Sequence, residues 1–149
     1  MSRLERYLHE TIPLTAAMGV TVRAEGPRRV VLAAPLAPNV NHKQTAFGGS
    51  VAALATLAAW SLAQLRAWQS GDDITLVIRD SRLEYLQPVT GELVAVCEFD
   101  DEPAWRRALE RLHDRGRARL ELASRLEDPA GAQIVRFRGT FVLLGSAAG

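Results

Sequence analysis

The sequence predicts an α+β domain in which a curled, mostly antiparallel sheet wraps around one long buried helix. Three observations predict this fold class. First, residues 48–65 carry no charged side chain and are rich in alanine, so a helix formed there is apolar all round and must be buried. Second, segments with the two-residue alternation of β-strands stand on both sides of this run. Third, short turns join several consecutive strands, which favours antiparallel pairing.

The bulk composition fits one cytoplasmic domain, residues 1–149. Hydrophobic residues make up 48% of the chain, charged residues 23%, and the net charge is +1, so no basic field favours nucleic acid or an anionic membrane. Charged residues interrupt the N-terminus, which therefore lacks the apolar run of a signal peptide. Cys97 is the single cysteine, which excludes an intrachain disulfide and zinc ligation by several cysteines. We expect neither a metal nor another cofactor.

The uncharged run is just long enough to be considered as a membrane span. It consists mainly of alanine, with serine, threonine and glutamine interspersed, and a lone span would leave the flanking strands without a common core. A buried central helix is the better interpretation.

The elements before this helix follow from apolar spacing and turn residues. Residues 4–12 have helical spacing, and Pro13 should end that helix. Residues 18–24 and 29–34 read as two short strands separated by a Glu-Gly-Pro turn. The central helix comes next.

The central helix should end near Trp68, with Gly71 as its stop signal. Residues 73–86 then form a long strand whose alternation slips by one residue near Asp80 and Ser81. Such a slip predicts a β-bulge, and bulges often re-aim side chains beside active sites.

The C-terminal half continues with a strand at residues 93–99. Asp101 can cap a surface helix that Gly116 ends. Two further strands, at residues 118–126 and 135–143, are joined by a hairpin turn, and the last few residues are expected to fray.

The candidate site is the start of the central helix, where Gly48 and Gly49 follow a polar loop. Glycines at a helix start leave backbone N–H groups uncovered, and the helix dipole favours negative charge there. These donors could hold a thioester carbonyl and the oxyanion formed when it is attacked, with Gly49 N–H as the first choice. Alternatively, the glycines only permit a tight turn and a close approach of the sheet.

The pattern Asn41-x5-Phe47-Gly48-Gly49-x6-Thr56 resembles the Asn-x5-His-Gly-Gly-x6-Asp signature of small hotdog acyl-CoA thioesterases. Residues 85–91 also resemble the strand and turn that follow the central helix in that superfamily. The segment Thr-Ala-Phe-Gly-Gly-Ser, residues 45–50, is most similar to the corresponding segment of a subgroup of thioesterase domains that are sometimes attached to an acetyltransferase domain. The resemblance implies a hotdog fold, acyl-CoA or acyl-carrier-protein partners, and a homo-oligomer, a dimer or a dimer of dimers, with sites between subunits.

Five residues are the catalytic candidates. Besides Gly49, Asn41 could orient water or the substrate carbonyl, or else cap its own loop. His42 could be a general base or only an exposed loop histidine. Thr56 occupies the position of the family carboxylate but has no basicity of its own. Asp80 could replace that carboxylate, or it could stabilise the bulge.

Further residues are candidates for substrate binding. Those at the helix start and on the following strand are Phe47, Gly48, Ser50 and Ser81. Cations that could meet the phosphates of the carrier, or remain solvated, are Lys43, Arg79 and Arg82.

The leading functional hypothesis is metal-free hydrolysis of an acyl-CoA or acyl-carrier thioester. The first alternative is a non-catalytic acyl-thioester binding or regulatory module that retains the fold without the carboxylate. A second alternative is a hydratase-like enzyme that uses His42, which would need an acidic partner on the helix.

Overall fold

The computed structural model describes residues 1–146, and its elements follow the predicted order with two short additions, α2 and η1. The helices are α1 (Arg3–Thr11), α2 (Pro13–Met18), the 3-10 turn η1 (Ala37–Asn39), α3 (Gly48–Ser70) and α4 (Glu102–Arg115). The strands are β1 (Thr21–Ala24), β2 (Arg29–Ala34), β3 (Ile74–Tyr85), β4 (Leu93–Glu98), β5 (Arg117–Glu127) and β6 (Gln133–Gly145). The expected fraying of the last residues lies outside the described part of the chain.

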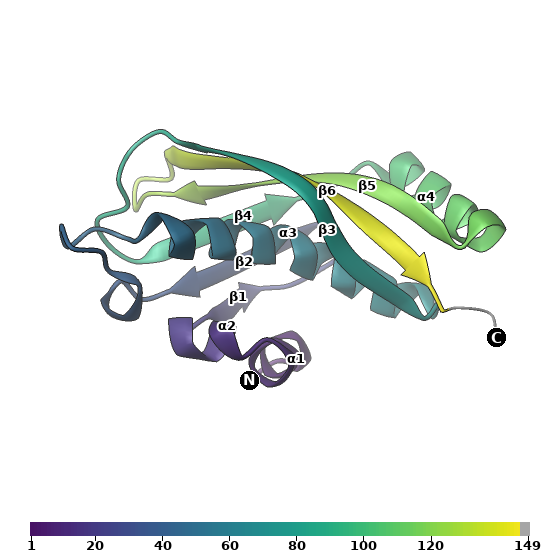
Figure 1. Cartoon of the computed structure of the whole chain (residues 1–149), viewed down its shortest axis with the longest axis horizontal. Helices are drawn as coiled ribbons and strands as arrows, with labels where there is room; N and C mark the ends of the chain where they lie inside the picture. The colour runs from purple at the N-terminus through teal and green to yellow at the C-terminus, as the bar shows by residue number, and fades with distance from the viewer. Residues whose placement is uncertain (147–149) are drawn as a thin grey trace.

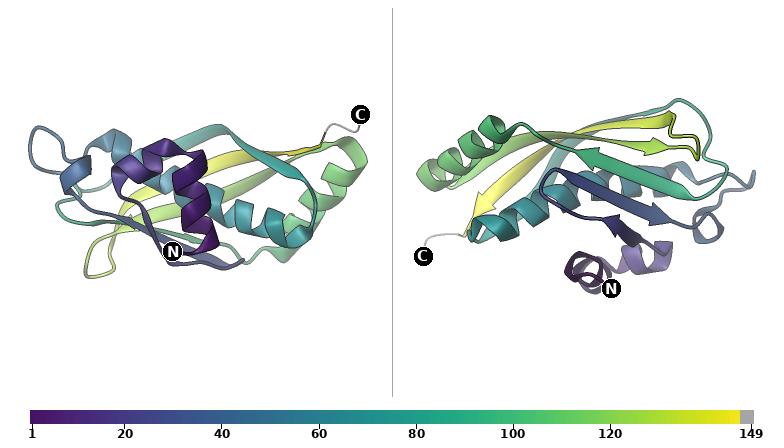
Figure 2. Two further views of the ribbon diagram at one scale, coloured as in Figure 1. Left: turned by 90° about the horizontal axis from the view of Figure 1, so that it is seen from below. Right: turned by 180° about the vertical axis from the view of Figure 1, so that it is seen from behind.

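Six antiparallel strands form one sheet in the order β1-β2-β4-β5-β6-β3, which curls around α3 as predicted (Figure 1). Helices α1 and α2 lie on the side of α3 that the sheet leaves open (Figure 2). This strand order makes β1 and β3 the two edges of the sheet. The pairing of β4 with β5 is short and involves only residues 124–126 of β5. Helix α4 also packs against β5.

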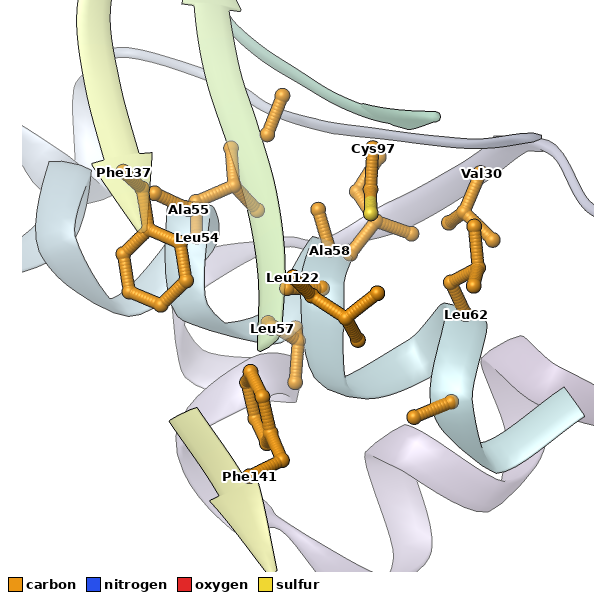
Figure 3. Packing of buried hydrophobic residues seen from close by; sticks show 14 of the residues in the cluster. Val30, Leu54, Ala55, Leu57, Ala58, Leu62, Cys97, Leu122, Phe137 and Phe141 are labelled. Carbon is orange, nitrogen blue, oxygen red and sulfur yellow. The ribbon is translucent and has the colours of Figure 1, made fainter. Parts of the chain in front are cut away.

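Small residues on α3 let the helix and the sheet approach closely. Ala55 and Ala58 are fully buried, and the Ser124 hydroxyl on β5 donates a 2.7 Å hydrogen bond to the carbonyl oxygen of Ala55. Phe137 and Phe141 pack against the same helix from β6 (Figure 3). The length and mean hydropathy (1.3) of α3 would suit a membrane span, but 56% of its apolar window is buried within the fold. This burial is typical of a core helix.

The predicted β-bulge in β3 is confirmed, with Arg79 as the extra residue between Ile78 and Asp80. Before the bulge, even-numbered residues such as Ile78 face α3. After it, odd-numbered residues from Ser81 to Tyr85 face α3, because they lie opposite the inward-facing residues of β6. The even-numbered residues that follow the bulge point to the outer face of the sheet.

The N-terminal segment differs from its prediction. Pro13 starts α2 after a one-residue break, because proline at the first helical position loses no helical hydrogen bond. Met18 is therefore the last residue of α2 and not part of a strand. Tyr7 of α1 packs on α3. Its ring stacks on that of Trp60, with 6.2 Å between the ring centroids, and meets the ring of Trp68 edge-on, with 5.1 Å between the centroids.

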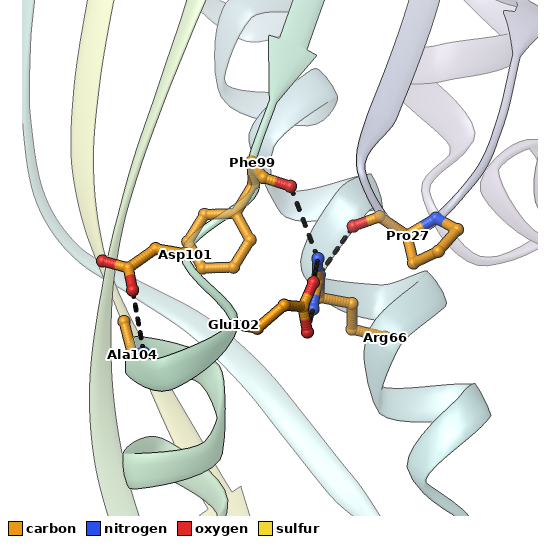
Figure 4. A network of polar contacts seen from close by, with 6 residues as sticks. All are labelled: Pro27, Arg66, Phe99, Asp101, Glu102 and Ala104. Atoms are coloured by element: carbon orange, nitrogen blue, oxygen red, sulfur yellow. Dashed lines mark hydrogen bonds and ion pairs between the residues drawn. The ribbon is translucent and has the colours of Figure 1, made fainter.

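Arg66 ends the uncharged run of α3, and its side chain is only 4% exposed. Figure 4 shows the polar contacts that surround it. It donates to the carbonyl oxygens of Pro27 (2.6 Å) and Phe99 (3.4 Å) and forms a two-pronged ion pair with Glu102 at 2.7 and 3.0 Å. The hydrogen bond from Arg66 lowers the pKa of the Glu102 carboxyl. This contact ties the end of α3 to the start of α4.

Candidate functional site

Helix α3 begins without a side-chain cap. Its N-cap residue is Phe47, whose carbonyl oxygen accepts from Val51 N–H at 3.1 Å and whose side chain has no oxygen to offer. Among residues 1–146, the N–H groups of Gly48, Gly49 and Ser50 have no hydrogen-bond acceptor. Three donors at the positive end of the helix dipole are therefore open to an oxygen that carries negative charge.

Backbone hydrogen bonds fix the loop in front of α3. Phe47 N–H donates to the carbonyl oxygen of Asn39 at 2.7 Å, and Ala46 N–H donates to that of Val89 at 2.8 Å. Asn39 and Val89 are both buried. The helix start is thus positioned by η1 on one side and by the turn after β3 on the other.

The side chain of Asn41 is used entirely within this loop. Its Oδ1 accepts from the N–H groups of Lys43 (2.8 Å) and Thr45 (3.1 Å), and its Nδ2 donates to Thr45 Oγ1 (2.8 Å) and to Ala46 O (3.4 Å). These contacts occupy both amide donors and the carbonyl oxygen. We therefore assign Asn41 to loop capping and not to the orientation of water or substrate.

The ring of Phe47 lies over Gly49. A Cβ added at Gly49 would come within 2.3 Å of a ring carbon, so any larger residue must displace the ring. Phe47 is 57% exposed, although it is large and apolar. The ring forms an apolar wall beside the uncovered N–H groups, at the place where Phe47 was expected to meet substrate.

Tyr85 is the site residue that sequence reasoning missed. Its hydroxyl donates a 3.1 Å hydrogen bond to the carbonyl oxygen of Gly48, and its ring would be 3.9 Å from a Cβ at that glycine. Residues 85–91 belonged to the resemblance, but their pattern did not indicate that Tyr85 reaches the helix start. The signal was the phase slip in β3, which turns Tyr85 towards α3.

Thr56 lies two turns into α3, at the position of the family carboxylate. Its hydroxyl donates to the carbonyl oxygen of Ala52 at 2.8 Å, a bond to its own helix. The proton is therefore engaged, and only the oxygen lone pairs can meet a ligand. No hydrogen bond or ion pair among residues 1–146 joins a carboxylate to Gly48, Gly49 or Ser50.

No described contact brings the two basic side chains of the loop to the helix start. The side chains of His42 and Lys43 are exposed, and neither makes a hydrogen bond or ion pair within residues 1–146. Gln44, next to them, has a positive φ of 65° and donates its N–H to Asn41 O at 3.2 Å, so this segment is a tight turn.

The structure corrects the placement of Asp80 and Arg82. Both point to the outer face of the sheet, away from α3, because the extra residue at Arg79 reverses the alternation. The Asp80 side chain is 69% exposed and pairs with Arg79 at 3.9 Å. Ser81 between them faces α3. Asp80 cannot replace the missing carboxylate, since its carboxylate lies on the other side of the sheet.

Cys97 is fully buried in β4, and burial raises the pKa of its thiol to about 12. Since the thiolate is the reactive form, its fraction at pH 8 should be on the order of 10⁻⁴. We expect the native protein not to react with an aromatic disulfide reagent at pH 8 and to react fully in guanidinium chloride. Labelling of the folded protein within minutes would contradict this. An unreactive protein thiol also gives thiol-release assays a low background.

Among residues 1–146, no three His, Cys, Asp or Glu side chains are grouped so that they could hold a metal ion. The polar groups gathered around the first turns of α3 are its open backbone donors, the Tyr85 hydroxyl and the Thr56 hydroxyl.

A family model described as "Putative thioesterase (yiiD_Cterm)" matches residues 1–145 of the chain. A "putative thioesterase" structure from Shewanella oneidensis is 28% identical, with TM-score 0.83 and coverage of 95% of both chains. A protein of unknown function from Chlorobaculum tepidum is 27% identical, with TM-score 0.91, covering 97% of this chain and 93% of that one. A thioesterase from Haemophilus influenzae (14% identity, TM-score 0.73, 99% and 94% covered) shares the fold. The hotdog fold is thereby confirmed.

Proposed function

Because the chain belongs to the family described as "Putative thioesterase (yiiD_Cterm)", we propose that it hydrolyses acyl thioesters of coenzyme A or of an acyl carrier protein. The observation that carries the proposal is the uncapped start of α3, where the N–H groups of Gly48, Gly49 and Ser50 are open. A dipole and three aligned donors are suited to an oxygen that gains charge during reaction.

In this mechanism, a water molecule that has lost a proton, and is thus hydroxide, adds to the thioester carbonyl carbon, and the carbonyl oxygen becomes an oxyanion. Gly49 N–H, with its neighbours, donates to that oxygen. Collapse of the intermediate breaks the C–S bond, and the departing thiolate takes up the proton that the water lost. The products are a carboxylic acid and a free thiol.

Thr56 can position the attacking water through its free oxygen lone pairs but cannot deprotonate it, because a neutral threonine hydroxyl is a very weak base. Hydroxide is then the nucleophile, and log kcat should rise with a slope of about one between roughly pH 7 and 9. A plateau above about pH 7 would instead indicate a histidine base, for which His42 is the candidate. The pH–rate profile thus separates the two routes.

The alternative function is an acyl-thioester binding module without turnover. It is favoured by the threonine at position 56 and by the use of Asn41 within its own loop. Such a module would retain the donors of α3 and would bind the thioester carbonyl without cleaving it.

The test measures the release of free thiol from acyl-CoAs of varied chain length and ring content, and an aromatic disulfide reagent detects the thiol. Turnover above that of an equal concentration of Gly49→Pro protein supports the thioesterase. No release from any substrate, with acyl-CoA still raising the Tm, supports the binding module. No release and no Tm shift would reject both.

We further infer that a second copy of the chain covers the free edge of β3. Trp60 Nε1 donates to Leu76 O at 3.2 Å and so occupies the start of this edge. Beyond it the edge has no strand partner among residues 1–146, and exposed apolar side chains stand at both ends of its charged middle: Val77 and Ile78 (43% and 41% exposed) on one side, Tyr85 and the adjoining Leu86 (54% and 43%) on the other. An edge with unpaired backbone groups and exposed apolar side chains favours pairing with another strand, and antiparallel pairing of this segment with itself is self-complementary.

Replacing Ile78 by lysine should weaken this dimer by roughly tenfold or more, since charged side chains on edge strands oppose pairing. Ile78 is partly exposed already, so the fold should tolerate the change. Sedimentation velocity across a concentration series measures the effect. Leu14→Lys on α2, another exposed apolar position (57%), is the matched control. A monomeric wild-type protein at all concentrations would reject the dimer.

A further inference from the structure

The carbonyl group of Gly48 and the N–H group of Gly49 belong to the same planar peptide unit. Tyr85 donates its hydroxyl hydrogen to the carbonyl end of that unit at 3.1 Å. The proposed oxyanion donor is at the other end. We propose that Tyr85 is a positioning residue for hydrolysis, which aims and polarises the Gly49 N–H without contacting the substrate. The inference rests on the proposed thioesterase function.

This peptide unit needs an external constraint. Both of its residues are glycines, which have the widest backbone freedom, and the helix has no side-chain cap to hold its first turn. In an α-helix the first carbonyl accepts one hydrogen bond from the N–H four residues later, and its second lone pair remains available. The Tyr85 hydroxyl occupies that second position from outside the helix.

Tyr85 is itself held by the sheet. It pairs with the fully buried Val135 of β6, and the next residue, Leu86, donates its N–H to Ile134 O at 2.9 Å. The bulge at Arg79 then decides the direction of the side chain. Without the extra residue, the alternation begun by the even-numbered residues of β3 would turn Tyr85 outward, away from α3. The bulge therefore allows the Tyr85 hydroxyl to reach the carbonyl oxygen of Gly48.

The hydrogen bond also acts through the electrons of the peptide group. A donor on the carbonyl oxygen draws charge from the nitrogen, so the N–H becomes a stronger donor. A stronger donor stabilises a full oxyanion more than it stabilises the weakly charged carbonyl of the bound substrate. Loss of the Tyr85 hydroxyl should therefore lower kcat and leave KM nearly unchanged.

The experiment compares Tyr85→Phe with Tyr7→Phe, the other tyrosine of the chain. Tyr7 packs on Trp60, twelve residues beyond Gly48 and so roughly 18 Å along α3. We expect Tyr85→Phe to reduce kcat by roughly 3- to 10-fold at constant KM and Tm. The Tyr7→Phe protein should retain the wild-type kcat.

A second readout observes the peptide group directly. The chain contains one Gly-Gly pair, so labelling with ¹³C-carbonyl, ¹⁵N-glycine makes Gly48–Gly49 the only doubly labelled peptide bond. One carbonyl-to-amide correlation peak, recorded at about pH 6 to slow amide exchange, then reports the Gly48 ¹³C and the Gly49 ¹⁵N shifts. Tyr85→Phe should move both to lower frequency, while Tyr7→Phe should leave both in place.

Unchanged kcat in Tyr85→Phe, or a rise in KM alone, would overturn the role of Tyr85 while wild-type turnover leaves the proposed function intact. An unmoved Gly48–Gly49 peak would also overturn it, since the hydrogen bond would then be absent in solution. A wild-type protein without turnover on any acyl-CoA would overturn the proposed function, and with it this inference.

Discussion

Replacing Gly49 by proline should lower kcat for thioester hydrolysis by roughly 100- to 1,000-fold, the usual loss when one oxyanion donor is removed. Proline has no N–H, and its fixed φ is tolerated in the first turn of a helix, where the N–H is not used by the helix itself. The N–H of Gly49 has no acceptor among the described residues, so its removal breaks no bond of the fold. Activity should fall while the melting temperature changes little.

Gly49→Ala is the control that isolates the N–H group. Alanine retains the N–H but, like proline, adds a Cβ that meets the ring of Phe47, which would be only 2.3 Å away. The ring is exposed and can rotate, so we expect a smaller loss in Gly49→Ala than in Gly49→Pro. Steady-state kinetics on the best substrate of the acyl-CoA panel measures both. Equal losses in the two variants would mean that the ring position matters and that the N–H does not.

Replacing Arg66 by methionine should lower the free energy of unfolding by about 3 kcal/mol, equivalent to a fall in Tm of about 6–12 °C. The carbonyl oxygen of Pro27 loses a 2.6 Å charge-assisted hydrogen bond, and Phe99 loses both a hydrogen bond and a guanidinium 4.7 Å above its ring. Methionine fills much of the volume, so the loss reports the polar contacts. Urea denaturation at pH 7 provides the measurement.

Two controls accompany this measurement. Arg111→Met, at an exposed arginine of α4, should change the stability by no more than about 0.5 kcal/mol.

The pH dependence is the second control, because Arg66 lowers the pKa of Glu102 below its ordinary value of 4.5. A lowered carboxyl pKa stabilises the fold above that value, and this contribution is lost as pH falls through the folded-state pKa. The gap between wild type and Arg66→Met should therefore narrow below pH 4.5, and a constant gap would contradict the ion pair.

Much of the fold could be predicted because its signals are local. The uncharged run from Gly48, the stop at Gly71 and the cap at Asp101 each depend on residues adjacent in the chain. Asp101 does accept from Ala104 N–H at 3.0 Å. The bulge in β3 was also predictable, since a change of apolar parity within one strand has few other causes.

The candidate site could be predicted only in part. The motif around Gly48 and Gly49 indicated a helix start with open donors, and the structure has those donors. The predicted roles of Asn41, Asp80 and Arg82 needed long-range information. The sequence allowed the Asn41 amide to bind either its own loop or a ligand. The folded loop shows that its partners are loop atoms.

The sequence by itself determined the central helix, its glycine start and the existence of a bulge, because these depend on hydrophobic period and on the backbone freedom of glycine. Only the tertiary structure decided which residue of the bulge is the extra one, and with it the face on which each later side chain of β3 lies. Shifting the extra residue by one position exchanges the two faces at that point, and no local preference of the chain selects between them. Pairing with β6 makes that selection, and it turns Asp80 outward and Tyr85 towards Gly48.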